Sequence, residues 1–264
     1  MPTVHANGID LYYEQRGEGP DLLLIMGLGA HSGAWALNAP ALAKHFRVTT
    51  FDNRGAGRSS APDEPYSMRG MAGDTASLLD ALGIARAHVV GASMGGMIAQ
   101  ELAINFPEKV NRLVIACSRT RASELRRLVS VAQRALWEAG VPRDSITAIQ
   151  QPWGSTGAIL QDEQKPLDRL ALAAKDPHPI QKHAYLRQLD ATMEHDTFDR
   201  LHQITAQTLV LVGGEDILTP PFESAEIARL IPGAELRILP RGGHGFTGEY
   251  PDDFNRAVRE FLSR

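Results

Sequence analysis

The chain has 264 residues, and its 27 Lys and Arg residues against 31 Asp and Glu residues leave a formal charge of −4. Proteins that hold nucleic-acid phosphates need clustered cationic residues, which this chain lacks, so no nucleic-acid partner is expected. Hydrophobic residues make up 43% and charged residues 22%, which indicates a globular chain that buries a full core rather than a disordered one.

The N-terminus, which begins Met1-Pro-Thr-Val, lacks the basic start and apolar stretch of an export signal. The longest near-continuous apolar stretch, residues 22–30, is interrupted by two glycines and is shorter than the roughly 20 residues of a membrane helix. The single cysteine, Cys117, has no partner for an intramolecular disulfide and is interpreted as a core thiol. These features predict a cytoplasmic protein without a membrane partner.

The first predicted element is a hairpin over residues 3–15. Asn7-Gly8 lies between Val4 and an alternating apolar run, which is a strong short-range signal for two antiparallel strands joined by a tight turn.

Six apolar runs then alternate with helix-length segments, at residues 22–25, 46–51, 87–90, 113–116, 209–212 and 236–239. Each run is too continuous for a strand with one solvated face and is typical of strands buried on both faces. The predicted fold class is therefore α/β, with a mostly parallel sheet whose crossovers are helices.

The alternation stops between Ser118 and Thr205. This stretch has apolar residues at helical spacing, several prolines and no convincing strand. We therefore predict an inserted helical lid at 119–205, between a first core segment at 1–118 and a second at 206–264.

A Gly-x-Ser-x-Gly motif centred on Ser93 follows the apolar run 87–90 and precedes a helix-like segment. A sharp strand-to-helix turn that exposes a serine needs small residues two positions before and after it, because the backbones approach closely. Gly91 and Gly95 occupy these positions. This context favours a nucleophilic Ser93 over an ordinary glycine-rich turn.

A serine nucleophile needs a base, and the base needs an orienting acid. Asp216 follows the run 209–212 at the carboxyl end of a predicted strand, where ligand sites of open α/β sheets lie, and Glu215 is the competing carboxylate. His244 follows the run 236–239 in the same way and completes the chain order Ser, acid, His. No pair of histidines has a His-x-x-x-His spacing, so no metal site is expected.

Acyl transfer also needs N–H donors directed at the developing oxyanion. One candidate is the backbone N–H of Met94, at the start of the helix after Ser93. The second is expected in the glycine-rich loop 26–31, where Leu28 is the first candidate and Gly29 the alternative. That loop lacks the spacing of phosphate-binding loops, which disfavours a phosphate cradle.

Together these segments resemble the α/β-hydrolase superfamily. Residues 51–59, Phe-Asp-Asn-Arg-Gly-Ala-Gly-Arg-Ser, resemble its Asp-x-Arg-Gly-x-Gly-x-Ser segment, and the loops of Asp216 and His244 resemble its acid and histidine loops. The resemblance covers about residues 3–118 and 206–264 and implies an α/β-hydrolase fold with a Ser-His-Asp triad. Four further segments look most like the enol-lactonase and small carboxylesterase branch, at 29–35, 81–84, 93–97 and 219–221.

Two positions depart from the family pattern. Met26-Gly27 stands where many members have His-Gly, which leaves the second oxyanion donor open, and Ser93 in place of Asp disfavours haloalkane dehalogenase and epoxide hydrolase activities. The enol-lactonase resemblance also implies a substrate carboxylate. Five lid arginines are candidates to hold it, although each is more typical of a solvated helix face: Arg119, Arg121, Arg126, Arg127 and Arg134.

The leading hypothesis is hydrolysis of a small carboxylic ester or lactone through an acyl-enzyme on Ser93, with no cofactor. The same triad also suits C–C bond hydrolysis and cofactor-free perhydrolysis, and a receptor-like binding protein is a third alternative. The oligomeric state stays open. The candidate substrate contacts are Gly29, His31, Trp137 and Trp153, and a stripe of lid leucines either walls the pocket or packs as lid core, at Leu125, Leu128 and Leu136.

Overall fold

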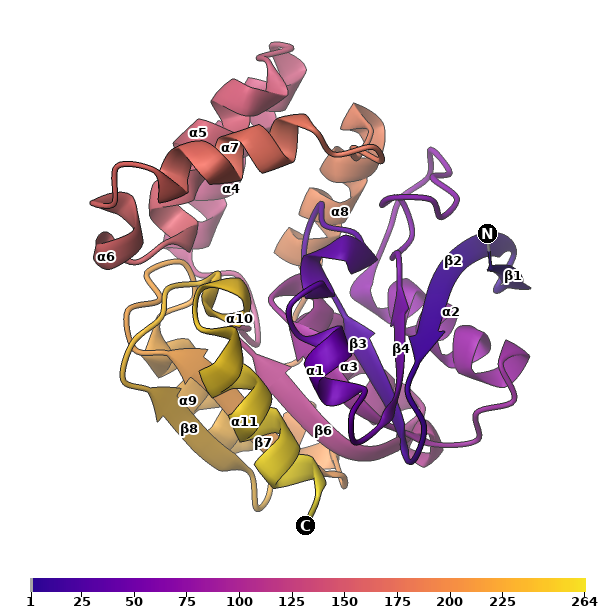
Figure 1. Ribbon diagram of the computed structural model, residues 1–264. Coiled ribbons are helices and arrows are strands. Elements are labelled where there is room, and N and C mark those ends of the chain that lie inside the picture. The colour runs from indigo at the N-terminus through magenta and orange to yellow at the C-terminus, as the bar shows by residue number, and fades with distance from the viewer. Residues whose placement is uncertain (1) are drawn as a thin grey trace.

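The computed structural model describes residues 2–264, which form one sheet of eight strands in the order β1-β2-β4-β3-β5-β6-β7-β8 (Figure 1). β2 pairs antiparallel with β1 and with β4, and the remaining neighbours pair in parallel. The strands are β1 (Thr3–Ala6), β2 (Ile9–Arg16), β3 (Asp21–Ile25), β4 (Arg47–Phe51), β5 (Ala87–Ala92), β6 (Val110–Ala116), β7 (Gln207–Gly213) and β8 (Glu235–Leu239).

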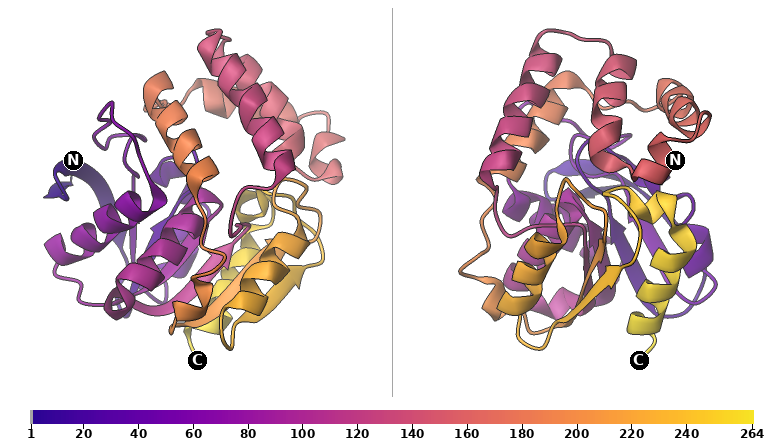
Figure 2. Two further views of the ribbon diagram at one scale, coloured as in Figure 1. Left: turned by 180° about the vertical axis from the view of Figure 1, so that it is seen from behind. Right: turned by 90° about the vertical axis from the view of Figure 1, so that its left-hand side faces the viewer.

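Helices cover both faces of this sheet (Figure 2). The core helices are α1 (Ala39–Leu42), α2 (Met68–Ala81), α3 (Met94–Asn105), α9 (Pro221–Leu230), α10 (Phe246–Glu249) and α11 (Pro251–Leu262). The helices between β6 and β7 are α4 (Glu124–Glu138), α5 (Arg143–Gly154), α6 (Gly157–Leu160), α7 (Lys165–Ala174) and α8 (Lys182–Glu194). Three short 3-10 helices lie at Ser32–Trp35, Pro107–Lys109 and Leu201–Gln203. No helix in residues 2–264 is both long and apolar enough to cross a membrane.

The N-terminal hairpin is confirmed. β1 and β2 are joined at Asn7 and Gly8, which have φ angles of 50° and 78°. Two successive residues with positive φ give the tight turn whose twist matches the flanking strands, and Asn-Gly is the pair that adopts it with least strain.

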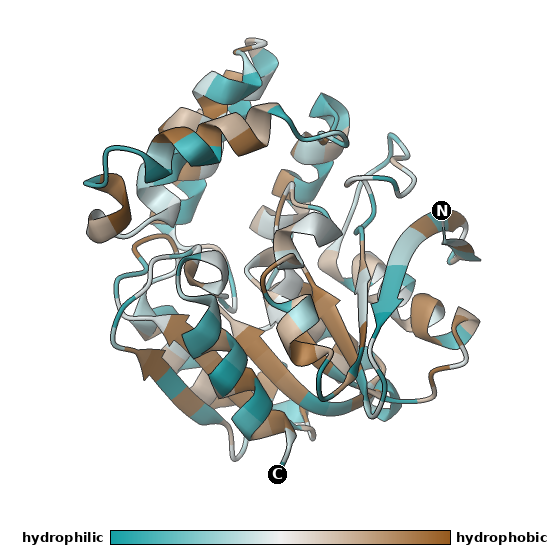
Figure 3. Ribbon diagram, viewed as in Figure 1, coloured by the Kyte–Doolittle hydropathy of each residue, from teal (hydrophilic) through white to brown (hydrophobic). Residues whose placement is uncertain are grey.

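The central strands divide their side chains between two hydrophobic layers. Leu23 and Ile25 of β3 face the layer that contains α2 and α3, whereas Leu22 and Leu24 face the layer that contains α1 and α11. Adjacent strand residues point to opposite faces, so burial on both faces requires a continuous apolar run. Figure 3 shows the hydrophobic strands β3 and β6 inside the helical layers.

The prediction of burial on both faces is wrong for β8. Leu236 and Ile238 are 40% and 48% exposed, because β8 is the edge strand of the sheet and only one of its faces is packed. An apolar run alone does not distinguish an edge strand from a central one.

The helices α4 to α8 lie together above the carboxyl ends of the parallel strands (Figures 1 and 2). Residues 118–205 contain no strand. Their β-type pairing is limited to one isolated bridge between Arg121 and Asp196. The inserted helices therefore cover the edge of the sheet at which the predicted catalytic loops emerge.

Candidate active site

Ser93 lies on the sharp turn between β5 and α3. Its φ of 57° and ψ of −118° place its backbone in a region that residues other than glycine rarely adopt. A Cβ atom on Gly91 would overlap the carbonyl oxygen of Gly95, and one on Gly95 would overlap that of Ile25. The two glycines of the motif are therefore required by close backbone approach, as the sequence predicts.

His244 and Asp216 meet Ser93 from two other loops. His244 lies between β8 and α10, with its Nε2 2.9 Å from Ser93 Oγ and its Nδ1 3.0 Å from Asp216 Oδ2. Asp216 follows β7, so all three side chains come from the carboxyl ends of strands. The structure thus brings together the three residues that the sequence predicts as nucleophile, base and acid. Glu215, the competing carboxylate, instead accepts the Gly242 N–H at 3.4 Å.

Asp216 is held by a set of donors from its own loop. Its Oδ1 accepts the N–H groups of Leu218 and Thr219 at 2.9 Å each, and its Oδ2 accepts the Thr219 hydroxyl at 2.8 Å. Burial opposes ionisation of this carboxyl, but the interactions with His244 and Thr219 outweigh it and hold its pKa below the usual value. Asp216 is therefore an anion fixed in one orientation beside the imidazole.

Thr219 is a site residue that the sequence analysis did not assign. Its Oγ1 lies 3.1 Å from His244 Nδ1 as well as 2.8 Å from Asp216 Oδ2. The available signal was its position three residues after Asp216, because Asp side chains commonly accept N–H groups two and three residues further along.

The loop after β3 lies against Ser93, as the predicted second oxyanion donor requires. A Cβ atom on Gly27 would lie 3.0 Å from that of Ser93. The backbone N–H groups of Leu28 and Met94 have no acceptor among residues 2–264, and Met94 is the first residue of α3. Neither N–H group is used by another protein group, which the predicted role as oxyanion donors requires.

Gly29, the alternative donor, is ruled out by its hydrogen bond. Its N–H donates to Gln188 Oε1 at 2.9 Å, and the same amide donates from Nε2 to the Arg54 carbonyl at 2.7 Å. Gln188 is fully buried on α8 and was not identified from the sequence. A residue from the inserted helices therefore fixes the loop that carries Leu28.

The segment after β4 supports the same loop. Asn53 Nδ2 donates to the Met26 carbonyl at 2.8 Å, and the buried Asp52 accepts the Ser32 N–H at 2.7 Å and the Arg58 N–H at 2.9 Å. Hydrogen bonds with Arg58 and Ser32 hold the pKa of Asp52 below its usual value, although burial, the largest influence, acts in the opposite direction. Asp52 and Asn53 therefore hold the two ends of the loop beside Ser93.

The predicted substrate contacts have different environments. His31 lines a cavity of about 430 Å³ between the loop after β3 and α7. Both ring nitrogens of His31 are already hydrogen-bonded, Nδ1 to the Gly33 N–H and Nε2 to Asp176. Gly29 and Trp137 line a cavity of about 170 Å³ that also reaches Leu28. Trp153 is 37% exposed and lines neither cavity, so it is not supported as a contact.

The predicted orientation of α4 is wrong. Leu125 and Leu128 are 45% and 70% exposed and neither wall a pocket nor form lid core, whereas Trp137 is buried and stacks on Tyr185 at 4.4 Å between ring centroids. Leu136 is half-buried and packs against that cluster.

Two of the five lid arginines also differ from the prediction. Arg119 and Arg126 are 3% and 5% exposed rather than solvated. The spacing of the leucines indicates a helix but does not show which of its faces turns inward.

The loop of His244 is anchored to the inserted helices by Glu249, the last residue of α10. This fully buried side chain accepts the Gly243 N–H at 3.1 Å and the Thr156 N–H at 3.2 Å, and pairs with Arg169 at 3.3 Å. The Gly245 N–H also donates to the Gly154 carbonyl at 2.7 Å. The insertion therefore bonds directly to Gly245 and is linked to Gly243 through Glu249 of α10.

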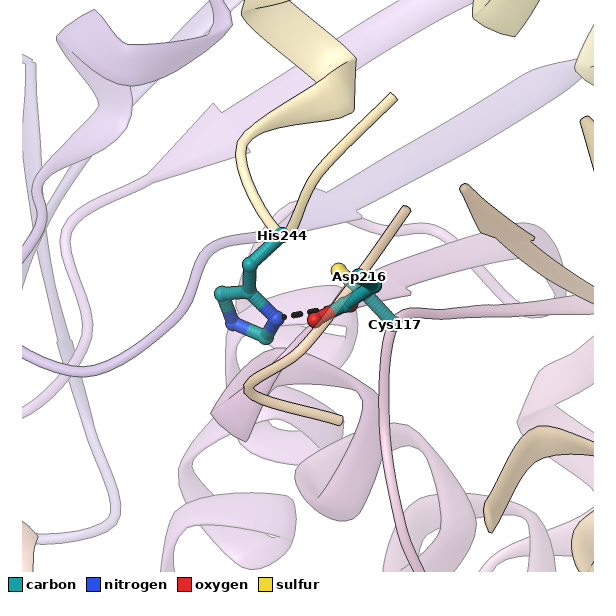
Figure 4. Close-up of side chains that lie close together, drawn as sticks. All are labelled: Cys117, Asp216 and His244. Carbon is teal, nitrogen blue, oxygen red and sulfur yellow. Dashed lines mark hydrogen bonds and ion pairs between the residues drawn. The ribbon is translucent and has the colours of Figure 1, made fainter. Parts of the chain in front are cut away.

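Cys117 lies beside Asp216 and His244 (Figure 4), and these three residues offer ligand-type atoms within 4.8 Å of one another. Asp216 and His244 use two of those atoms for their mutual hydrogen bond. Burial raises the pKa of the Cys117 thiol well above its usual value, so the thiol stays protonated. The arrangement fits a core thiol behind the acid rather than a metal centre.

Comparisons with known proteins show the family to which this fold belongs. A family described as alpha/beta hydrolase fold matches residues 20–249. The enol-lactonase from Burkholderia xenovorans LB400 has a TM-score of 0.91 at 29% identity over all of both chains, and a thermophilic esterase from Thermogutta terrifontis has 0.87 at 26% identity over 100% of this chain and 98% of its own. A protein described as a carbamate hydrolase, RutD, from Azorhizobium caulinodans is 33% identical over 267 residues, which cover 99% of this chain and 98% of its own. The chain belongs to the α/β-hydrolase family.

Proposed function

We propose that the protein hydrolyses a carboxylic ester or lactone through an acyl-enzyme on Ser93. The observation that carries this proposal is the chain of contacts from Ser93 Oγ to His244 Nε2 at 2.9 Å and from His244 Nδ1 to Asp216 Oδ2 at 3.0 Å. A hydroxyl in contact with a base that is itself oriented by a carboxylate is the arrangement that activates a serine.

In the first half-reaction His244 takes the Ser93 proton while Oγ attacks the substrate carbonyl. Asp216 keeps Nδ1 protonated, so that Nε2 is free to accept, and it stabilises the imidazolium that forms. His244 then protonates the departing alkoxide. In the second half-reaction it removes a proton from water, which attacks the acyl-enzyme and releases the acid.

The developing oxyanion is stabilised by the Leu28 and Met94 N–H groups. They are preorganised because Gln188 and Asn53 hold the loop of Leu28, while α3 begins at Met94. Fixed donors stabilise transition-state charge without reorganisation during the reaction, and loss of one such donor costs roughly 10²–10³ in turnover in comparable enzymes.

The names of the relatives support hydrolysis at an activated carbonyl and leave open which carbonyl compound is preferred. An enol-lactonase and an esterase are among the similar structures, and a carbamate hydrolase is among the similar sequences. All three reactions suit the same serine, base and oxyanion site.

The experiment is a turnover panel of a short acyl ester, an enol-lactone, a carbamate and a vinylogous diketone. The proposal expects the ester or the lactone to give the highest kcat/KM, and Ser93→Ala to lower it by roughly 10⁴-fold or more. Ser263→Ala, on the exposed C-terminal residues, serves as the control. Preference for the diketone, or wild-type esterase activity in Ser93→Ala, would contradict the proposal.

A further inference from the structure

The segment 116–118, where the chain leaves β6, holds both backbone polar groups of Ser93. The Ser93 N–H donates to the Ala116 carbonyl at 2.9 Å, and the Ser118 hydroxyl donates to the Ser93 carbonyl at 2.9 Å. Ser93 has a φ of 57°, so its backbone conformation persists only with support from its surroundings. Part of that support comes from the end of β6, the strand that pairs with β5.

The Ser118 side chain fits closely against the first turn of α3. It is fully buried, and its Cβ lies 2.6 Å from where a Cβ atom on Gly96 would stand. A side chain at Gly96 would therefore push Ser118 away from the helix. This close approach explains a residue without a side chain at position 96, which the Gly-x-Ser-x-Gly motif itself does not specify.

Gln100 orients the Ser118 hydroxyl. This fully buried amide lies on α3, and its Nε2 donates to the Arg119 carbonyl at 3.1 Å and lies 3.5 Å from Ser118 Oγ. Its Oε1 accepts the Thr197 hydroxyl at 2.6 Å. Because an N–H group faces the Ser118 oxygen, that hydroxyl keeps its own proton for the Ser93 carbonyl. Polar contacts thus run from the end of the insertion, through Gln100 and Ser118, to the nucleophile turn.

The Ser93 carbonyl belongs to the same peptide unit as the Met94 N–H, which the proposed mechanism uses as an oxyanion donor. This peptide is trans, so its carbonyl and its N–H lie in one plane and point in opposite directions. A donor that fixes the direction of the carbonyl therefore also fixes the direction of the N–H. It also polarises the peptide, because hydrogen bonds in a chain strengthen one another.

Two N–H groups within α3 also donate to the Ser93 carbonyl. They are those of Gly96 and Met97, at 2.9 and 3.3 Å, and such bonds form wherever a helix begins. The carbonyl therefore stays satisfied when the Ser118 hydroxyl is removed, and the fold should lose little stability. The Ser118 hydroxyl adds a bond from outside the helix, and this bond acts on the orientation and polarity of the peptide.

We propose that Ser118 is a positioning residue for the oxyanion donor. Its hydroxyl orients and polarises the peptide between Ser93 and Met94, so that the Met94 N–H binds the negative charge that develops on the substrate carbonyl oxygen. This inference rests on the proposed acyl-enzyme hydrolysis and adds a buried side chain to an oxyanion site otherwise made of the Leu28 and Met94 N–H groups.

The first test compares Ser118→Ala with wild type on a short acyl ester. Loss of this one oxygen atom should lower kcat by roughly 10-fold and leave KM within about threefold, because the interaction strengthens only as charge develops in the transition state. The melting temperature should fall by no more than about 4 °C, since helical N–H groups still bond the Ser93 carbonyl. Ser118→Cys, with a weaker donor at the same place, should also lower kcat.

Thr75→Val is the matched control. The Thr75 hydroxyl is also fully buried and donates to a backbone carbonyl, that of Met71, at 2.8 Å. It lies on α2, which carries none of the triad residues. Both variants lose one buried bond of the same kind, so both should lose a similar small amount of stability. Only Ser118→Ala should lose turnover, and kcat of Thr75→Val should stay within about threefold of wild type.

A spectroscopic measurement separates a weakened oxyanion donor from a displaced nucleophile. The acyl-enzyme formed with para-nitrophenyl cinnamate, isotope-labelled at the acyl carbonyl, gives a carbonyl stretch that infrared difference spectroscopy resolves. Hydrogen bonds to the acyl oxygen weaken its C=O bond and lower this frequency. Ser118→Ala and Ser118→Cys should therefore move the band to higher frequency, whereas Thr75→Val should leave it at the wild-type position.

An unchanged kcat in Ser118→Ala, or a lower kcat with the wild-type carbonyl frequency, would overturn the proposal. A large drop in the melting temperature of Ser118→Ala would assign the hydroxyl a structural role and overturn it as well. Absence of an acyl-enzyme in wild type would instead count against the proposed function on which this inference rests. An acyl-enzyme whose carbonyl frequency does not respond to the loss of Ser118 would overturn this inference alone.

Discussion

Gln188 Oε1 accepts the Gly29 N–H at 2.9 Å, so a helix inserted between β6 and β7 fixes the loop that follows β3. The same side chain donates to the Arg54 carbonyl at 2.7 Å. The inserted helices therefore do more than cover the site, because one of them holds the backbone that presents the Leu28 N–H.

Replacing Gln188 by Leu should lower kcat by roughly 10- to 100-fold, because loosening the Leu28 loop weakens the oxyanion donor. It should also reduce the free energy of unfolding by about 1–3 kcal/mol, since the Gly29 N–H and the Arg54 carbonyl would lose their partner. Steady-state kinetics and urea denaturation would measure both. Gln181→Leu, at the exposed start of α8, is the control. An unchanged kcat in Gln188→Leu would show that the loop does not need this support.

Thr219→Val should make the activity more sensitive to acid. The Thr219 hydroxyl contributes to the lowered pKa of Asp216, so its removal raises that pKa toward the usual value. Protonation of Asp216 then begins at a higher pH and withdraws the orienting charge from His244. The ratio of variant to wild-type kcat/KM should therefore fall as the pH is lowered from 6 to about 4, the usual pKa of an aspartate. A ratio that stays constant over this interval would exclude this role for the hydroxyl.

Gly95→Val should prevent folding of the nucleophile turn, because a side chain there overlaps the Ile25 carbonyl. The backbone cannot move aside as a flexible side chain can. The free energy of unfolding should therefore fall by more than about 4 kcal/mol, the upper range for single substitutions. Gly248→Ala, where an added Cβ meets nothing within 4 Å, is the control and should remain folded. Soluble yield and thermal unfolding measure the difference, and a stable Gly95→Val protein would contradict the packing described for β3 and α3.

His195 should make the fold less stable in mild acid. Burial, aided by Arg119, lowers its pKa to about 3, so the native state keeps the ring neutral while the unfolded chain takes up a proton below its ordinary pKa near 6.5. Lower pH therefore favours the unfolded state, by about 2 kcal/mol between pH 7 and pH 5 for this one group. Urea denaturation at pH 7 and pH 5 should show that the free energy of unfolding changes less between the two pH values in His195→Gln than in wild type. An identical difference in both proteins would mean that His195 is not buried as a neutral ring.

Much of the sheet was predictable from its continuous apolar runs. The run Leu22-Leu23-Leu24-Ile25 sends alternate side chains into two hydrophobic layers, which no other secondary structure of that length requires. The grouping of Ser93, Asp216 and His244 was predictable because each follows a predicted strand, and parallel strands bring their carboxyl ends to one edge.

The inserted helices were predictable only as helices. Gln188 contacts residues that are far away in the sequence, and Nε and Nη1 of Arg126 have no hydrogen-bond partner among residues 2–264. Helical spacing carries no information about either condition. Burial of a polar side chain is decided by tertiary contacts, so the orientation of α4 could not be derived from its leucines.

The central claim is that Ser93 becomes acylated during turnover. Rapid acid quenching of the enzyme with a short acyl ester, followed by mass spectrometry of the peptide that contains Ser93, tests it directly. Wild type should gain the mass of the acyl group on that peptide. The gain should be absent in Ser93→Ala and, because attack would lack its base, strongly reduced in His244→Ala. Ester turnover without an acyl adduct, or an adduct on another residue, would contradict the account.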